Sequence, residues 1–287
     1  MICFCCDSIG ISKSYINEEE YYHCNNCGLI YLKDSGKKEN FDSLRRHYQK
    51  NDPYKEVSKS KKVFYDWVLN YLSSRSKRNG RKILDIGCGY GYFLEMASKR
   101  GWEPTGVEVV QDAVKSSQRK AGSNNIFFGK LKEACLSENS FDAISLWDVI
   151  AIVENPSDEL KECYRLLKSG GIIGIRTRNV LFQISTYRLF TPIKNVALRF
   201  GFKKPYVFNK YCFSKKSLVA LLSKLDYVNI KIANSPLTCG DPYNHMPYHY
   251  FVKVTKTIIN SCSVVVSLIT GGKCLIAPSL LIWAEKP

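Results

Sequence analysis

With 287 residues and 45% apolar content, the chain is long enough for one large domain or for one domain with a small appendage, and a mainly disordered chain is excluded. Its formal net charge of +16 favours anionic partners. The N-terminus, Met1-Ile2-Cys3-Phe4-Cys5, lacks the charged-then-apolar pattern of a signal peptide, so we expect a cytoplasmic protein. The twelve cysteines would then be reduced, which excludes a disulfide framework.

Four cysteines near the N-terminus have the spacing of a structural zinc site. Cys3 and Cys6 form one C-x2-C pair, and Cys24 and Cys27 form a second pair after seventeen intervening residues. Each pair can supply two thiolates from one tight turn, and the residues between the pairs can form a small hairpin. Cys5 leaves a second register open for the first pair, and scattered buried cysteines are the alternative. Because four protein ligands leave no open position, we expect the Zn²⁺ to be structural.

The stretch from Ile83 to Gly91, ILDIGCGYG, predicts a strand, a tight turn and the start of a helix. Glycines at 87, 89 and 91 allow positive φ angles and a close approach of the backbone to a ligand, and the helix start offers free N–H groups. Tyr92 stands where a dinucleotide fingerprint would place its third glycine, so this turn departs from the NAD-binding pattern. A merely tight strand-to-helix connection is the alternative.

The residues between the cysteines and this turn indicate a linker followed by a helix. Residues 33–62 are polar, with one short helix expected around 41–48. Apolar residues recur at helical spacing from 58 to 76, where we expect a longer helix that packs on the sheet. Tyr48 and Tyr54 are placed where this segment could fold over a ligand, with exposed linker aromatics as the alternative.

Strands and helices alternate beyond the glycine turn. This alternation predicts a parallel, doubly wound sheet with its ligand at the carboxyl ends of the strands. Glu108 ends the second strand, seventeen residues after Gly91, and is placed to accept hydrogen bonds from both hydroxyls of a ribose. The expected strands after the first are 102–107, 125–128, 141–147, 172–176, 227–233 and 274–283; the expected helices are 112–120, one from Pro156 with Gly170-Gly171 as its stop, 214–225 and 251–269.

The run from Ile83 to Thr177 resembles the core of class I S-adenosylmethionine-dependent methyltransferases. The resemblance rests on LDIGCGYG as the first motif, GVEVV with the ribose acid, FDAISLWDVI as the fourth strand and LLKSGGIIGIRTRN as the fifth. The paired cysteines resemble the subgroup that carries a small zinc-binding module ahead of the catalytic domain. The resemblance implies an α/β, Rossmann-like, seven-stranded doubly wound sheet, with six parallel strands and an antiparallel last strand, behind an N-terminal zinc ribbon.

The same resemblance implies a cofactor site for S-adenosyl-L-methionine. Asp85 and the glycine turn would line its methionine part, Glu108 would hold the ribose, and Trp147 with Asp148 would border the methyl group. Lys130 departs from the pattern, because many relatives have Asp there, and Ala151-Ile152 replaces a common Glu-His. The full set of expected cofactor-binding residues is Asp85, Gly87, Cys88, Gly89, Gly91, Glu108, Val109, Gly129, Trp147 and Asp148.

These motifs divide the chain into three predicted parts. Residues 1–35 form the zinc-binding module, and 36–80 form a linker with N-terminal helices that cover the cofactor site. Residues 81–287 form the methyltransferase domain, with substrate or lid insertions at about 178–213 and 235–272.

The expected activity is methyl transfer to a small anionic acceptor, with a nucleotide-linked or lipid-linked sugar of a surface glycan as the favoured one. No Asp or Glu occurs between Glu162 and Asp226, so this stretch either faces solvent or borders an anionic ligand. Arg176, Arg178 and Tyr243 are the candidate substrate residues. The alternatives are an rRNA or tRNA methyltransferase, which the positive charge would suit, and a non-catalytic scaffold with the methyltransferase fold.

If the acceptor is a hydroxyl, a base must remove its proton, and His245, His249 and Asp148 are the candidates. The helix expected at 251–269 is uncharged from Thr257 to Gly272. It is too short to span a bilayer and is expected to be a core or lid helix, with peripheral contact to the inner membrane face as the alternative.

Overall fold

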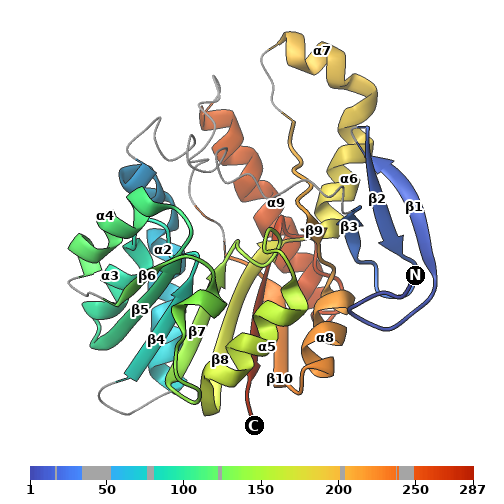
Figure 1. The fold of residues 1–287 in the computed structure, drawn as a ribbon. Coiled ribbons are helices and arrows are strands. Elements are labelled where there is room, and N and C mark those ends of the chain that lie inside the picture. Colours follow the sequence, from blue (N-terminus) through green and yellow to red (C-terminus); the bar gives the residue numbers. More distant parts are fainter. Residues whose placement is uncertain are drawn as a thin grey trace.

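The computed structural model describes residues 1–16, 18–33, 53–75, 81–121, 125–200, 204–236, 238 and 249–287. Within these residues the chain forms a seven-stranded sheet with helices on both faces and a smaller four-stranded sheet at one side (Figure 1).

The large sheet confirms the expected fold. Its strand order is β10-β11-β8-β7-β4-β5-β6. Strands β8, β7, β4, β5 and β6 pair with one another in parallel. Strand β11 runs antiparallel to both of its neighbours, β8 and β10, so the last strand of the chain is the reversed one. The strands are β4 (Arg81–Ile86), β5 (Trp102–Glu108), β6 (Ile126–Phe128), β7 (Phe141–Trp147), β8 (Leu167–Arg178), β10 (Val228–Asn234) and β11 (Ser279–Glu285).

Helices cover both faces because successive side chains of the buried strands point to opposite sides. On β4, Ile83 belongs to the same hydrophobic cluster as Phe64 of α2, while Leu84 belongs to the cluster that contains Leu160 of α5. Full burial of each such side chain contributes about 1.5–3 kcal/mol. One face carries α2 (Pro53–Arg75), α3 (Tyr92–Ser98) and α4 (Gln111–Ala121); the other carries α5 (Pro156–Leu166), α8 (Lys215–Lys224) and the short 3₁₀ helix η1 (Leu131–Ala134).

Two of the predicted element boundaries that were wrong can be explained by tertiary contacts. Helix α5 ends at Leu166, and Gly170-Gly171 lies inside β8 instead of stopping the helix. The reason is tertiary, because the Gly170 N–H donates to the Lys286 carbonyl and the Lys286 N–H donates to the Gly171 carbonyl. The last strand begins at Ser279, not at 274, since the preceding residues form a loop whose carbonyls accept hydrogen bonds from the Asn179 side chain.

The small sheet has the antiparallel order β1-β2-β3-β9. Strands β1 (Ile11–Ile16) and β2 (Glu19–Cys24) form the hairpin expected between the two cysteine pairs, and β3 (Ile30–Leu32) follows the second pair. Strand β9 (Tyr211–Cys212) comes from the far part of the chain and pairs with β3. The sequence did not predict this strand.

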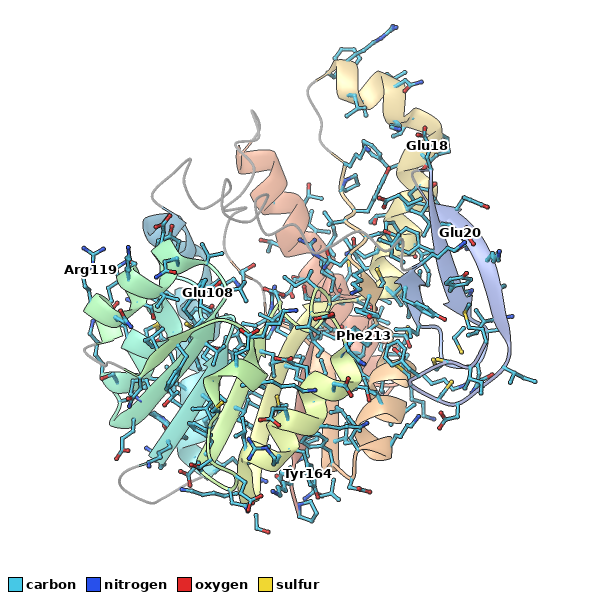
Figure 2. The ribbon with its side chains drawn as sticks, viewed as in Figure 1. Glu18, Glu20, Glu108, Arg119, Tyr164 and Phe213 are labelled. Atoms are coloured by element: carbon cyan, nitrogen blue, oxygen red, sulfur yellow. The ribbon has the colours of Figure 1, made fainter. Side chains whose placement is uncertain are left out.

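We call the described N-terminal residues up to 33 the cysteine module. This module and the large sheet share a continuous hydrophobic core. Leu29 of the module and Phe213 beside β9 are both fully buried in the cluster that also contains the α5 and α8 side chains. Figure 2 labels Phe213. The Ser214 hydroxyl donates to the Cys27 carbonyl at 2.5 Å, and the Tyr211 N–H donates to the Ala151 carbonyl at 3.0 Å. The module is therefore packed against the loop that follows β7. The predicted domain boundaries remain predictions.

Two insertions carry further helices. The first contains α6 (Val180–Phe190), the 3₁₀ helix η2 (Thr191–Ile193) and α7 (Lys194–Arg199), and the second contains α9 (His249–Ile269). Helix α9 was expected to be a core or lid helix, and the exposure of its apolar residues Ile258, Val265 and Leu268 does not fit a core helix. Among the described residues, no helix combines the length and the hydropathy needed to cross a membrane. The helix expected at 41–48, with Tyr48, lies outside the described residues.

Candidate functional site

The glycine turn joins β4 to α3 at the carboxyl end of the sheet. Gly87, Gly89 and Gly91 have φ angles of 67°, 53° and 75°, in the left-handed region that favours glycine. A Cβ at Gly87 would lie 2.5 Å from Val149 Cγ2, and one at Gly91 would lie 2.2 Å from Ser117 Oγ. The missing Cβ at Gly87 therefore leaves room for the loop after β7, and the missing Cβ at Gly91 leaves room for α4.

Glu108 ends β5 beside this turn and is buried (Figure 2). Its Oε2 accepts a hydrogen bond from the Gly89 N–H at 2.8 Å, and its Oε1 accepts one from the Val110 N–H at 2.9 Å. Burial raises the pKa of Glu108, and these backbone donors oppose that rise. The neighbouring Val109 is partly exposed. Two backbone donors thus hold the carboxylate against the glycine turn, and its contact with a ribose stays a prediction.

Asp85 lies one strand away, buried at the end of β4. Its Oδ1 accepts a hydrogen bond from the Ser145 hydroxyl of β7 at 2.6 Å. Burial raises the pKa of Asp85 to about 7, although Ser145 and the Lys61 charge act in the opposite direction.

Asp148 directly follows β7 and forms ion pairs with two cationic side chains. Its Oδ2 accepts hydrogen bonds from Lys61 Nζ at 3.1 Å and from Arg176 Nη1 at 2.5 Å. Burial by itself would raise the pKa of Asp148, but Arg176 and Lys61 lower it to about 2. A carboxylate that binds protons so weakly is a poor base at neutral pH, so the expectation that Asp148 is the catalytic base does not fit its surroundings.

Arg176 is held on several sides at the end of β8. Its Nε donates to Ser235 Oγ at 3.0 Å, and its guanidinium lies 5.4 Å from the centre of the Phe64 ring. Arg178, two residues later on the same side of the strand, is exposed, and its charge also lowers the pKa of Asp148. The two candidate substrate arginines therefore differ, because Arg176 is fixed in an ion pair whereas Arg178 reaches solvent.

Trp147 is the last residue of β7 and directly precedes Asp148. Its ring packs edge-to-face against Phe64, Phe93 and Trp283. The indole N–H is buried and has no hydrogen-bond partner among the described residues. Together with the glycine turn and Glu108, this unpaired donor fits a site that is completed by a bound cofactor.

The structure describes only some of the other residues expected at the site. Gly129, with φ of 127°, follows β6, and its N–H donates to the Glu108 carbonyl at 3.0 Å. Cys88 is buried behind the turn against Ser117. Tyr243 and His245 lie outside the described residues, and His249 is the first residue of α9, where the backbone alone is described.

Two site residues were missed by the sequence analysis. Lys61 lies one helical turn before Phe64 and Tyr65 on the buried side of α2, and this position on an apolar stripe was the available signal. Ser145 is a buried polar residue within the apolar run of β7. Neither residue belongs to a recognisable motif, because each acts through a partner from another strand or helix.

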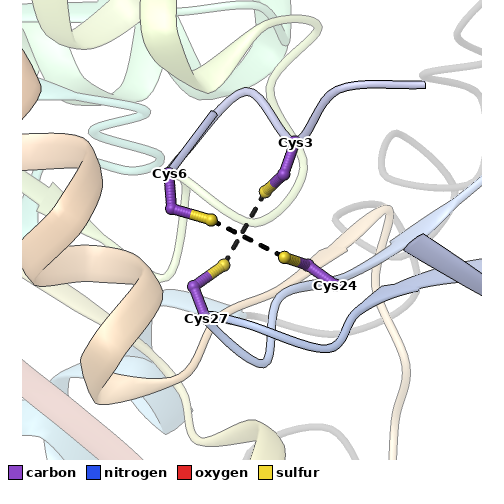
Figure 3. Close-up of side chains that lie close together, drawn as sticks. All are labelled: Cys3, Cys6, Cys24 and Cys27. Carbon is purple, nitrogen blue, oxygen red and sulfur yellow. Dashed lines mark hydrogen bonds between the residues drawn. The ribbon is translucent and has the colours of Figure 1, made fainter. Parts of the chain in front are cut away.

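The four predicted zinc ligands converge in the cysteine module (Figure 3). Cys3 Sγ lies 3.7 Å from Cys27 Sγ, Cys6 Sγ lies 3.6 Å from Cys24 Sγ, and all four sulfurs lie within 4.8 Å of one another. Tetrahedral zinc with Zn–S bonds of about 2.3 Å requires sulfurs about 3.8 Å apart, so the donor set fits this metal. Cys5 is buried but is not part of the cluster.

Comparison with known proteins agrees with this geometry. Residues 59–232 match the family model described as a methyltransferase domain. A ubiquinone biosynthesis O-methyltransferase of Glaesserella parasuis is 35% identical over 109 residues, which cover 35% of this chain and 46% of that protein. One of Paracidovorax citrulli is 27% identical over 117 residues, which cover 39% and 49%. The matched part is thus about half the length of these curated relatives.

Solved structures share the fold. An S-adenosylmethionine-dependent methyltransferase of Thermotoga maritima superposes with a TM-score of 0.54 at 17% identity, covering 86% of this chain and 100% of that one. Phosphoethanolamine N-methyltransferase 2 of Haemonchus contortus gives a TM-score of 0.53 at 16% identity, covering 96% and 71%. The family match extends over more than half of the chain and includes the glycine turn, Glu108 and Asp148. The chain therefore belongs to the methyltransferase domain family and is a class I methyltransferase whose cofactor is S-adenosylmethionine.

Proposed function

We propose that this enzyme transfers a methyl group to an oxygen of a small anionic acceptor bound at the ends of β7 and β8. The observation that carries the proposal is the charge around Asp148. Three cations, Lys61, Arg176 and Arg178, act on this one carboxylate, so the cluster keeps a net positive charge. Arg178 is exposed and can hold an anionic group in two-point contact.

S-adenosylmethionine supplies an electrophilic methyl group on a sulfonium. The cations favour the ionised form of an acidic acceptor hydroxyl, so its proton passes to solvent before transfer. An acceptor oxygen held beside these cations would be placed to take the methyl group that the cofactor, held by the glycine turn and Glu108, would supply, with the S–C bonding pair going to sulfur. Asp148 positions Lys61 and Arg176 in this scheme and takes up no proton. His245 and His249 remain the candidate bases for an acceptor whose hydroxyl is not acidic.

Oxygen as the acceptor atom is supported by the O-methyltransferase names of the curated relatives. These relatives do not support the nucleotide-linked or lipid-linked sugar expected from the sequence, and we do not propose it further. An RNA acceptor would require phosphate contacts along an extended face, and its binding would fall steeply with salt. RNA therefore serves as the competing substrate in the test below.

We also propose that Cys3, Cys6, Cys24 and Cys27 hold a structural Zn²⁺. The sulfur spacing supports this assignment. Four thiolates complete a tetrahedral shell, so the metal would supply no open coordination position for catalysis. Its expected role is to fix the two turns against Phe213 and the loop that follows β7.

The test measures transfer of a labelled methyl group to phenols, carboxylates and phosphate esters, and in parallel to total RNA, at low and moderate salt. We expect transfer to an anionic small molecule, with Arg178→Gln raising the KM for that acceptor about tenfold, as for loss of a charge-assisted hydrogen bond. The affinity for S-adenosylhomocysteine should not change. Arg119→Gln, an exposed arginine of α4, is the matched control. Transfer to RNA alone, or an unchanged KM in Arg178→Gln, would contradict the proposal.

A further inference from the structure

The first insertion presents an apolar stripe to solvent. We call residues 180–200, which contain α6, η2 and α7, the arm. Leu189, Ile193, Val196 and Phe200 recur at i, i+4, i+7 and i+11, and their exposed fractions are 77%, 56%, 59% and 69%. Helix α7 buries none of its residues. A patch of this kind on a protein surface marks an interaction site.

The opposite side of the arm is firmly packed. The Val207 N–H donates to Gln183 Oε1 at 2.8 Å, and the Phe190 ring contacts the Tyr206 ring edge-on. Val180 is buried in the cluster that contains side chains of β1, β2 and β3. The arm is thus anchored along one side, and α7 lies at its far end, away from the large sheet (Figure 1). The exposed stripe is therefore not a face that the protein's own described core covers.

Basic residues accompany the stripe. Arg188, Lys194 and Arg199 lie within the arm, and no acidic residue occurs between Glu162 and Asp226. A helix with an apolar stripe and basic neighbours is typical of segments that lie in the interface of an anionic membrane. A second copy of the chain would instead bring two sets of these cations together, which costs free energy.

We propose that the arm binds the surface of a bilayer that contains anionic lipids. The four apolar side chains enter the boundary between headgroups and acyl chains, and the three basic residues face lipid phosphates. This partner goes beyond the methyl-transfer reaction and beyond the contact expected through α9, which stays a separate prediction.

The arm also begins at the acceptor side of the site. Arg178 ends β8, and Asn179 caps α6 by accepting a hydrogen bond from the Leu181 N–H at 3.1 Å. The arm therefore links the acceptor side of the site to the proposed membrane-binding stripe, so that the lipid tail of an acceptor held at Arg178 could extend along it towards the bilayer. This consequence rests on the proposed function, whereas the binding experiment below requires no methyl transfer and can succeed or fail independently of it.

The experiment is co-sedimentation of the full chain with vesicles of phosphatidylcholine alone and of phosphatidylcholine mixed with phosphatidylglycerol. We expect binding to the mixed vesicles, weaker binding at high salt and little binding to phosphatidylcholine alone. Phe200→Ser should lower the partition coefficient about tenfold through lost apolar burial. Arg199→Ser should lower it about fivefold, as for loss of one basic residue at an anionic surface.

Ile9→Ser is the matched control, because Ile9 is 81% exposed but lies in the cysteine module. Its partition coefficient should equal that of the unmodified chain. Thermal unfolding shows whether each variant folds, and Val196→Ser provides a second apolar variant if Phe200→Ser does not. Absent binding, equal binding to both vesicle types, or unchanged binding in the apolar variants would overturn the proposal. So would a dimer in sedimentation velocity that Phe200→Ser dissociates while vesicle binding persists.

Discussion

Asp148 and Arg176 are joined twice, through their backbones and through their side chains. The Asp148 N–H donates to the Arg176 carbonyl at 2.9 Å, and Arg176 Nη1 donates to Asp148 Oδ2. Asp148 has a φ of 68°, which is uncommon for a residue with a Cβ and costs of order 1–3 kcal/mol. The two contacts hold this conformation and direct the carboxylate at the cations instead of at the cofactor turn.

The role of Asp148 can be tested by Asp148→Asn. Asparagine tolerates the left-handed backbone, so this change removes the charge without adding strain. If Asp148 only positions Lys61 and Arg176, kcat should fall less than tenfold, whereas the loss of a general base would cost about 10²–10⁴-fold. Steady-state kinetics with an acceptor found in the methyl-transfer assay decides between these outcomes. A fall in kcat within the larger range would show that Asp148 is the base after all.

Substitution by alanine should have different effects on stability and cofactor binding at two glycines with similar φ angles. Gly91 and Gly101 have φ angles of 75° and 77°, but only Gly91 is crowded, because its Cβ would lie 2.2 Å from Ser117 Oγ. Gly101→Ala should therefore cost only about 1–2 kcal/mol of backbone strain. Gly91→Ala should cost more and should abolish binding of S-adenosylhomocysteine in calorimetric titration. Equal affinities in the two variants would contradict the assignment of the turn.

Removal of zinc should affect more than the cysteine module. Elemental analysis is expected to find one zinc per chain, and Cys24→Ser should lose it. Because β3 pairs with β9 and Leu29 shares a core with Phe213, we expect hydrogen exchange to increase at 206–213 as well as at 1–33. Cys135→Ser, at an exposed cysteine, is the control. Increases confined to 1–33 would show that the module is independent of the sheet.

The raised pKa of Asp85 predicts that the contribution of this carboxyl group to the stability of the cofactor-free protein falls as the pH rises towards 7. Burial raises the pKa of Asp85 from 3.8 to about 7, so between these values the folded chain binds more protons than the unfolded chain. The contribution of Asp85 to the free energy of unfolding should therefore fall by up to about 1.4 kcal/mol per pH unit, or about 2–3 kcal/mol from pH 5 to 7.

Asp85→Asn should flatten this dependence, since asparagine can still accept the hydrogen bond from Ser145 and has no titration. Urea unfolding at several pH values measures the slope. Glu108 acts with the same sign, because burial also raises its pKa, so a residual slope should remain. Asp148 acts in the opposite direction, but only below about pH 4, outside this window. A variant whose slope equals that of the unmodified chain would contradict the shift at Asp85.

The sequence by itself determined the fold class and the glycine turn, and it predicted the ribose acid and the four cysteines that cluster in the structure. Each of these depends on residues that are close together in the chain. The alternation of apolar residues fixes which strand faces are buried, the glycines permit the turn, and the C-x2-C spacing permits two tight knuckles. Glu108 could be proposed as the ribose acid because an acid at the end of the second strand follows the glycine turn at a typical spacing in such a unit.

Only the tertiary structure decided which distant groups meet. Lys61 reaches Asp148 from a helix more than eighty residues earlier, β9 completes the sheet of the cysteine module, and Lys286 draws Gly170 into β8. These contacts depend on how helices and strands pack, and no local pattern records that packing. The charge of Asp148 was visible in the sequence, but its pKa was not, because the cations that lower it come from α2 and β8.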